Sequence, residues 1–129
     1  MIPDFPAPHL RTYPTYTVVA EKLHAIALLG MTNSRLKDYL DVAVIFDREV
    51  LDADTLATAI AATFARRGMA VPTQLPIGLT DEFANDRSRQ DLWSVFLKKN
   101  DLEAVPLQAI VTKLRNNLQG PLSQSADVL

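Results

Sequence analysis

Five charged residues in the first third of the chain have types and spacings that could do chemistry. Lys22 stands among apolar residues of a predicted helix, where a flexible point charge could contact a phosphate. Asp38 and Asp41 are three residues apart on the next predicted helix, and carboxylates at that spacing can bind a cation or act as a base. Arg35 and Lys37 could pair with these carboxylates or help to hold a polyanion.

Spacing alone favours a simpler interpretation of these residues as surface charges. Lys22 would lie at the edge of an amphipathic helix, with its stem on apolar surface and its amine in water. Asp38 would complement the helix dipole in the first turn, and Asp41 would form a surface ion pair.

The rest of the chain gives no strong sign of a second site. His24 is expected to be a half-buried structural histidine, because no nucleophile triad surrounds it. The chain contains only four glycines and no glycine-rich phosphate loop. Capping of helix ends is the simplest interpretation of the remaining basic pairs, and an RNA-backbone surface is the alternative. These pairs are Arg66-Arg67, Lys98-Lys99 and Lys113-Arg115.

Two helices must position the charged residues. Apolar periodicity predicts a first helix over about residues 17–29, which ends at Gly30. Ser34 is the predicted N-cap of a second helix whose apolar face extends to Phe46. Because only a few residues join them, the two helices should form an antiparallel hairpin.

Further helices are predicted downstream of this hairpin. Asp52 or Asp54 should cap a third helix, and Thr80 should cap a short one. Ser88 and Asp91 resemble a capping box at the start of another helix. A final helix should begin near Pro106 and end at Gly120-Pro121.

The predicted fold class is mainly α, a bundle of about five to six helices with an extended N-terminal arm. Residues 1–16 form that arm, because Pro3, Pro6, Pro8 and Pro14 disfavour helix, and residues 9–13 could be a strand without a partner. Residues 17–120 form the helical domain. Residues 121–129 are expected to be a flexible tail.

Composition limits the class of protein. The chain has 129 residues, 48% of them hydrophobic, which suits one domain with a real core. It has no cysteine, so disulfides and thiolate metal sites are excluded, and its two histidines are too far apart to suggest a metal site. The net charge of −2 does not indicate a nucleic-acid partner. Without a signal peptide or an apolar run long enough to span a bilayer, we expect a cytoplasmic protein and no membrane partner.

Three blocks in order resemble the AbiEii/AbiGii-type toxin family of nucleotidyltransferases. They are Asp4-Phe-Pro-Ala-Pro-His-Leu-Arg-Thr-Tyr-Pro, Thr17-Val-Val-Ala-Glu-Lys-Leu-His-Ala and Asn33-Ser-Arg-Leu-Lys-Asp-Tyr-Leu-Asp. The resemblance covers about residues 4–100 and is specific over 4–47.

The resemblance implies a polymerase-β-like fold, in which an N-terminal mixed sheet binds metal and nucleotide and a C-terminal helical part follows. It implies that Lys22 contacts nucleotide phosphates, with Arg35 and Lys37 as further nucleotide-binding residues. It also implies that Asp38 is an active-site carboxylate, with Asp41 beside it. Mg²⁺ and a nucleoside triphosphate are the implied cofactors. Some members add nucleotides to the tRNA acceptor end, and a cognate antitoxin is usually encoded alongside.

The chain departs from the family pattern in two places. It has no Gly-Ser followed by an Asp-x-Asp pair, the motif that holds the metal, and Tyr39-Leu40-Asp41 stands where Phe-Tyr-Asp is common. Two-metal phosphoryl chemistry needs clustered carboxylates to hold its cations. We therefore expect the C-terminal segment of such an enzyme, from a truncated or split gene, inactive alone and partnered by a separate N-terminal half. The alternative is a non-catalytic helical module that binds an antitoxin or a partner subunit.

Overall fold

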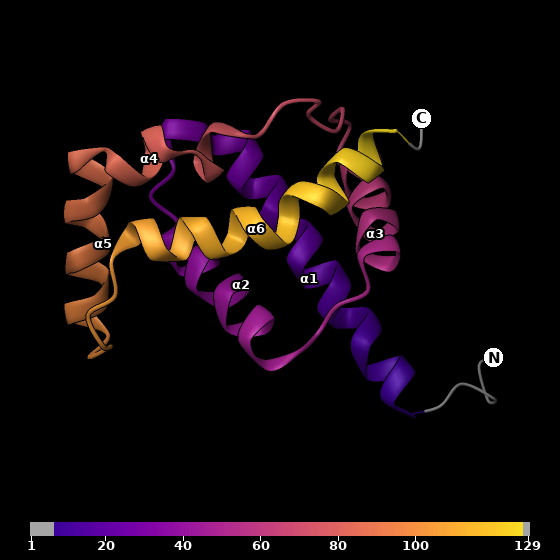
Figure 1. Cartoon of the computed structure of the whole chain (residues 1–129), viewed down its shortest axis with the longest axis horizontal. Helices are drawn as coiled ribbons and strands as arrows, with labels where there is room; N and C mark the ends of the chain where they lie inside the picture. The colour runs from indigo at the N-terminus through magenta and orange to yellow at the C-terminus, as the bar shows by residue number, and fades with distance from the viewer. Residues whose placement is uncertain (1–6, 128–129) are drawn as a thin grey trace.

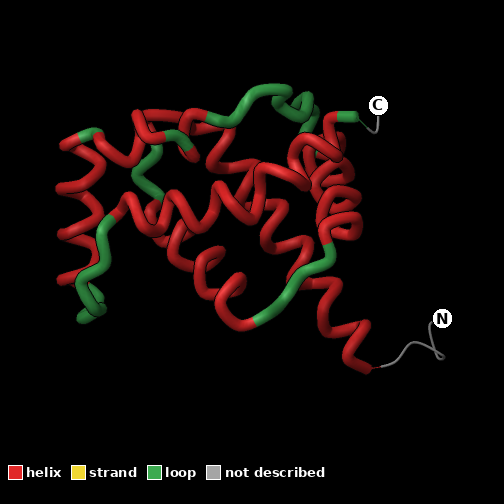
Figure 2. The backbone as a smooth tube through the Cα atoms, viewed as in Figure 1, coloured by secondary structure: helices red, strands yellow, loops and turns green. Residues whose placement is uncertain are grey.

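Helices make up most of this protein. The structure, a computed structural model, describes residues 7–127, with side chains from Pro14 onward. Its helices are α1 (Ala7–Leu29), α2 (Leu36–Arg48), α3 (Ala53–Arg66), α4 (Asp81–Asn85), α5 (Arg87–Lys99) and α6 (Leu107–Ala126) (Figure 1). Two short 3₁₀ turns, η1 (Gly30–Thr32) and η2 (Ile77–Leu79), lie between them. Over residues 7–127 there is no strand (Figure 2), so the prediction of a mainly α bundle is confirmed.

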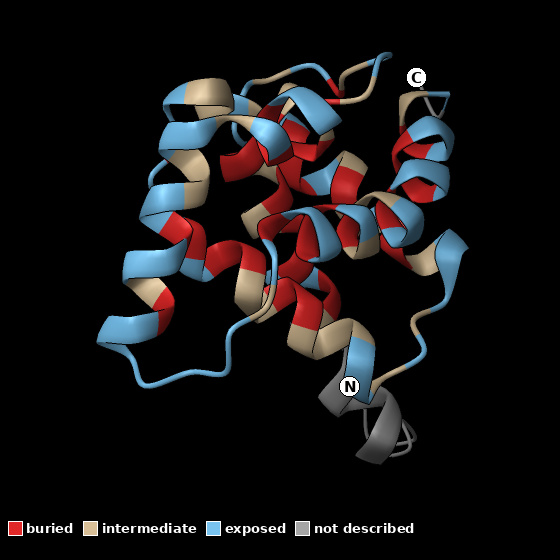
Figure 3. Ribbon diagram, turned by 60° about the vertical axis from the view of Figure 1, so that its left-hand side comes forward, coloured by how far each residue is buried: buried red, intermediate tan, exposed pale blue. Residues whose placement is uncertain are grey.

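The core lies where α6 crosses the other helices. α6 packs on α2, α3 and α4, while α1 packs on α3 and α2. Each of these helices turns an apolar face inward, and Figure 3 shows the buried residues gathered along those faces. Burying one large apolar side chain stabilises the fold by about 1.5–3 kcal/mol. Completely or almost completely buried members of the core include Leu23, Ile26, Tyr39, Ile60, Phe64, Phe83, Leu114 and Leu118.

Several predicted helix ends are confirmed. α1 ends at Leu29, and Gly30 follows with a φ of 54°, a left-handed conformation that suits glycine. The carboxylate of Asp52 accepts a hydrogen bond from the amide of Thr55 at 2.9 Å and so caps α3. Thr80 caps α4 in the same way through the amide of Phe83.

Two other predicted caps are wrong. α2 begins after Arg35, and no side chain caps it at that position, so Ser34 is not its N-cap. α5 is capped by Asp86, whose carboxylate accepts a hydrogen bond from the amide of Arg89 at 3.0 Å, rather than by Ser88. A carboxylate two residues upstream therefore displaces the predicted capping box.

The prediction of an extended N-terminal arm is wrong for residues 7–16, which belong to α1; residues 1–6 lie outside the described residues. The candidate strand over 9–13 is likewise helical. Pro8 is the second residue of α1, where a missing N–H costs nothing. Pro14 is inside the helix, which costs about 3 kcal/mol in isolation. Burial of Tyr16 and Val19 just beyond it anchors the helix against the core.

The prediction of a flexible tail over 121–129 is wrong for residues 121–126. α6 continues through Gly120 and Pro121 to Ala126. Leu122 continues the apolar spacing of Leu114 and Leu118 and is buried with them. Packing of this continuous face outweighs the local helix-breaking tendency of the Gly-Pro pair.

Within the part of the chain that the structure describes, no helix combines the length and apolar character that a membrane crossing requires.

Candidate functional site

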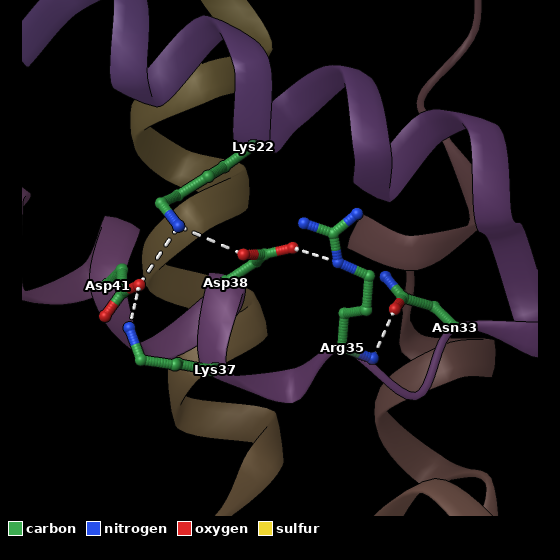
Figure 4. A network of polar contacts seen from close by, with 6 residues as sticks. All are labelled: Lys22, Asn33, Arg35, Lys37, Asp38 and Asp41. Atoms are coloured by element: carbon green, nitrogen blue, oxygen red, sulfur yellow. Dashed lines mark hydrogen bonds and ion pairs between the residues drawn. The ribbon is translucent and has the colours of Figure 1, made fainter.

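The five charged residues singled out from the sequence meet at the contact between α1 and α2. Lys22 Nζ donates to Asp38 Oδ1 and to Asp41 Oδ2, each at 3.0 Å (Figure 4). Lys37 Nζ donates to the same Asp41 oxygen at 2.8 Å, and Arg35 Nε lies 3.1 Å from Asp38 Oδ2. We call Lys22, Arg35, Lys37, Asp38 and Asp41 the charge cluster.

The register of the two helices brings the charge cluster together. On α2, Asp38 and Asp41 share a side because they are three residues apart, and Lys37 reaches Asp41 across four residues. On α1, Val19, Leu23 and Ile26 are completely buried and seat the helix on the core. That seating leaves Lys22 at the edge of the buried face, opposite the carboxylates of α2. As predicted, α2 turns back along α1 after a short connection (Figure 1).

Burial separates the members of the cluster into two groups. The side chain of Asp38 is 7% exposed, and those of Lys22 and Asp41 are 23% and 28% exposed. Arg35 and Lys37 are mostly exposed, at 61% and 73%. A buried charge is costly unless it is paired. The interpretation of Lys22 as an amine extended into water is therefore wrong, because two carboxylates hold its ammonium group.

The charge cluster keeps Lys22 and Asp41 ionised. Burial by itself would lower the pKa of Lys22, but hydrogen bonds and charge interactions with Asp41 and Asp38 raise it above its ordinary value. Burial would likewise raise the pKa of Asp41, but Lys37 and Lys22 lower it. Lys22 therefore remains an ammonium ion and Asp41 a carboxylate around neutral pH.

An open pocket of about 420 Å³ lies beside the charge cluster along α1. Val18 and Leu28, which are 40% and 62% exposed, supply part of its apolar surface. Lys22 and Arg35 line it from the side of the charge cluster. His24 also lines it, but its ring packs edge-to-face on Phe64 with 5.2 Å between centroids, as a half-buried structural histidine would. The pocket thus combines an apolar surface with cationic groups.

Sequence reasoning missed two charged residues of this pocket. Arg67, which was predicted to cap a helix end or, in the alternative, to belong to an RNA-backbone surface, lines the pocket together with Glu21. Arg66 and Arg67 both pair with Glu21 at 2.9 Å and so tie the end of α3 to α1. The pairing joins positions 45 and 46 residues apart, so no local pattern in the sequence signals it.

The residues of the charge cluster do not fit a Mg²⁺ site. Lys22 and Lys37 occupy Asp41, while Lys22 and Arg35 occupy Asp38. Among the side chains of residues 14–127, no three of His, Cys, Asp or Glu are grouped so as to hold a metal ion. Asp52-Ala53-Asp54 is an Asp-x-Asp sequence, but Asp52 caps α3 and Asp54 accepts a hydrogen bond from Gln124.

Comparison with known proteins identifies the family. Searches of the curated proteins and of the solved structures found no match. The profile of the family described as "Nucleotidyl transferase AbiEii toxin, Type IV TA system" matches residues 1–116, most of the 129-residue chain and all of the charge cluster. The resemblance noted in the sequence is thereby confirmed, and the chain belongs to the AbiEii family of nucleotidyl transferase toxins of type IV toxin–antitoxin systems.

Proposed function

We propose that this chain supplies the helical wall of a nucleotidyltransferase active site, in a toxin that transfers a nucleoside monophosphate from a nucleoside triphosphate to an RNA such as tRNA. The observation that carries the proposal is the convergence of the charge cluster beside an open pocket, in a chain of the AbiEii family.

In this proposal the cations of the charge cluster contact the triphosphate. An ammonium group has three donors, and the two carboxylates engage two of those of Lys22. The third can donate to a phosphate oxygen, while the exposed side chains of Arg35 and Lys37 add further positive charge. Asp38 and Asp41 then act on the reaction through Lys22, because they hold its amine in place and keep it charged.

The metal-binding carboxylates of the reaction come from elsewhere in this proposal. Since Asp38 and Asp41 are occupied by cations, a separate N-terminal nucleotidyltransferase half would supply the Gly-Ser and Asp-x-Asp motif, with Mg²⁺. The pocket beside Lys22 is the surface that this half and the nucleotide would share. The chain alone is then inactive.

Labelled nucleotide transfer tests the proposal. The purified chain, incubated with labelled nucleoside triphosphates, Mg²⁺ and tRNA, should transfer nothing, and addition of the N-terminal half of a family member should restore transfer. Lys22→Ala should then reduce transfer at least about ten-fold, the effect of losing one charged hydrogen bond. Arg87→Ala, at an exposed position at the start of α5, is the matched control and should have no effect.

Two outcomes would contradict the proposal. Transfer by the chain alone would show that it holds a complete active site. Equal transfer by the Lys22→Ala variant and the unsubstituted chain in the restored assembly would remove Lys22 from the site.

A second candidate function is a non-catalytic module that binds the antitoxin. Val18 and Leu28 favour it, because large apolar side chains exposed on one helix suit a protein partner. A cognate antitoxin that binds the chain, with binding lost in Leu28→Asp and no transfer restored by any N-terminal half, would support this function. A neighbouring reading frame that encodes Gly-Ser and Asp-x-Asp would favour the enzyme instead.

A further inference from the structure

A side chain of α5 contacts the connection between α1 and α2. Arg89 Nη1 donates to the backbone carbonyl oxygen of Asn33 at 2.6 Å. The Arg89 side chain is only 16% exposed, although α5 lies at the edge of the molecule (Figure 1). A guanidinium group in such a position costs free energy unless its donors are used, and the Asn33 carbonyl takes Nη1, whereas Nε has only the Asp86 carboxylate at 3.7 Å. The hydrogen bond to Asn33 therefore offsets part of the free-energy cost of burying Arg89.

Asn33 in turn contacts the start of α2. It is completely buried, and its Oδ1 accepts a hydrogen bond from the backbone amide of Arg35 at 2.7 Å. Arg35 is the N-cap residue of α2 but has no capping side chain of its own. Asn33 thus closes a tight turn directly before α2, as an asparagine side chain does when it accepts from the amide two residues further on.

From Arg35 the contacts continue to the most buried member of the charge cluster. Arg35 Nε lies 3.1 Å from Asp38 Oδ2, and the other oxygen of Asp38 accepts from Lys22 at 3.0 Å (Figure 4). A continuous path of polar contacts therefore joins α5 to Lys22, through the turn that sets the direction of α2.

We infer that Arg89 and Asn33 are positioning residues of the charge cluster. By fixing the turn into α2, they hold Arg35 and Asp38 where they can engage Lys22. The inference deepens the proposed function, on which it rests for its consequence in catalysis. The position of the Lys22 amine, however, can be measured without any nucleotide.

Selective acetylation of lysines measures that geometry in the full chain. Under limited acetic anhydride, mass spectrometry gives the reaction rate of each lysine, and Lys22 should react slowly because two carboxylates hold its amine. Arg89→Gln should raise the Lys22 rate about five-fold, the factor that corresponds to losing one ordinary hydrogen bond. Arg87→Gln, at an exposed position on the same helix, is the matched control and should leave the rate unchanged.

Two further variants separate positioning from general stability. Asn33→Ala should raise the Lys22 rate as Arg89→Gln does, and the double variant should add little, because both residues act on the same turn. Lys113, which pairs with Asp47, reports on the rest of the fold and should react as before. If Arg89→Gln does not fold, Arg89→Lys retains one donor for the Asn33 carbonyl and should give a smaller rise.

An unchanged Lys22 rate in a folded Arg89→Gln variant would overturn the inference. An equal rise at Lys22 and Lys113 would also overturn it, because that pattern marks a general loss of structure. In an assembly with restored transfer, Arg89→Gln should lower activity, and it should add no further loss to Lys22→Ala. Transfer that never appears would count against the proposed function, while the labelling result would stand separately.

Discussion

Lys22 shows how the environment of one residue fixes its charge. Its ammonium group lies between Asp38 and Asp41, and the side chain is only 23% exposed. Removing one partner from such a group leaves a buried charge poorly paired. The free energy of folding that is lost then exceeds the net contribution of the intact pair. A lysine held in this way presents its remaining donor in a defined direction, as contact with a phosphate requires.

The charge cluster makes stability depend on pH at the acid end. The folded-state pKa of Asp41 is lowered by Lys37 and Lys22, which oppose the effect of burial. A carboxyl group with a lowered pKa stabilises the fold above its unfolded-state pKa, near 4, and this stability is lost as pH falls through the folded-state value. We expect the free energy of unfolding, measured in urea from neutral pH to about pH 3, to fall less steeply below pH 5 in Asp41→Asn than in the unsubstituted chain.

Asp91→Asn, exposed on α5, is the control for this experiment and should follow the unsubstituted chain. Parallel curves for Asp41→Asn and the unsubstituted chain would show that Asp41 is not perturbed by its partners. At alkaline pH the stability instead falls as pH rises, because the pKa of Lys22 is raised in the folded state. Its contribution is complete below its unfolded-state pKa, near 10.4, and is lost as pH rises through the folded-state value.

At the scale of single elements, local sequence signals predicted several helix ends correctly. They failed where the burial of neighbouring side chains determines whether a helix continues. Gly30 and Thr80 mark helix boundaries through their own backbone or side-chain chemistry, so the sequence predicts them. Pro14 and Pro121 were expected to exclude helix, yet buried neighbours keep both inside helices. The energy that overrides a local rule comes from residues distant in sequence, which no short pattern contains.

The same distinction applies to the candidate site. Lys22, Asp38 and Asp41 could be singled out from the sequence, and the predicted hairpin puts them on adjoining helices, but their direct contact was not predicted. The contacts of the residues that surround these three could not be predicted from the sequence. Arg89 meets Asn33 across 56 positions, and Arg67 meets Glu21 across 46. Such contacts depend on how α3 and α5 pack, and neither arginine has a local signature that separates it from the other basic residues.

Gly78 allows η2 to pack closely against α1 and α2. A Cβ atom at this position would lie 2.6 Å from Tyr39 Oη and 2.7 Å from Ile26 Cγ2, both in the core. The Tyr39 hydroxyl also donates to the Gly78 carbonyl at 2.8 Å. Gly78→Ala should therefore lower the free energy of unfolding by about 1–3 kcal/mol in urea denaturation, because the core must shift to admit a methyl group.

Gly120→Ala is the matched control for this substitution. Gly120 lies within α6, and a Cβ there meets nothing within 4 Å outside the adjacent residues, so the gain in helix propensity from alanine, roughly 0.5–1 kcal/mol, is opposed only by the crowding of Pro121 on the residue before it. A clearly larger loss of stability in Gly78→Ala than in Gly120→Ala supports the observed packing of η2. A Gly78→Ala variant as stable as the unsubstituted chain would mean that η2 does not pack closely against α1 and α2.

At the scale of the whole molecule, α5 packs less extensively on the rest of the fold than the other described helices do. It packs on α4 and α2 at one edge of the bundle (Figure 1). Trp93, the single tryptophan of the chain, lies on its buried side, is 2% exposed and donates from Nε1 to the Val105 carbonyl at 2.6 Å. Together with the contact between Arg89 and Asn33, this bond joins α5 to the rest of the fold.

Two probes can therefore tell whether α5 unfolds with the bundle. Trp93 fluorescence reports on α5, whereas far-ultraviolet circular dichroism reports on all the helices. In urea the two transitions should coincide, with a slope of about 1–3 kcal/mol per molar, because the buried contacts of α5 make it part of one cooperative unit. Arg89→Gln should shift the fluorescence midpoint to lower urea than the dichroism midpoint, since it removes the contact from α5 to the connection between α1 and α2. Separate transitions in the unsubstituted chain would instead make α5 an independent unit, unable to hold Asn33 and the turn into α2 in a fixed geometry.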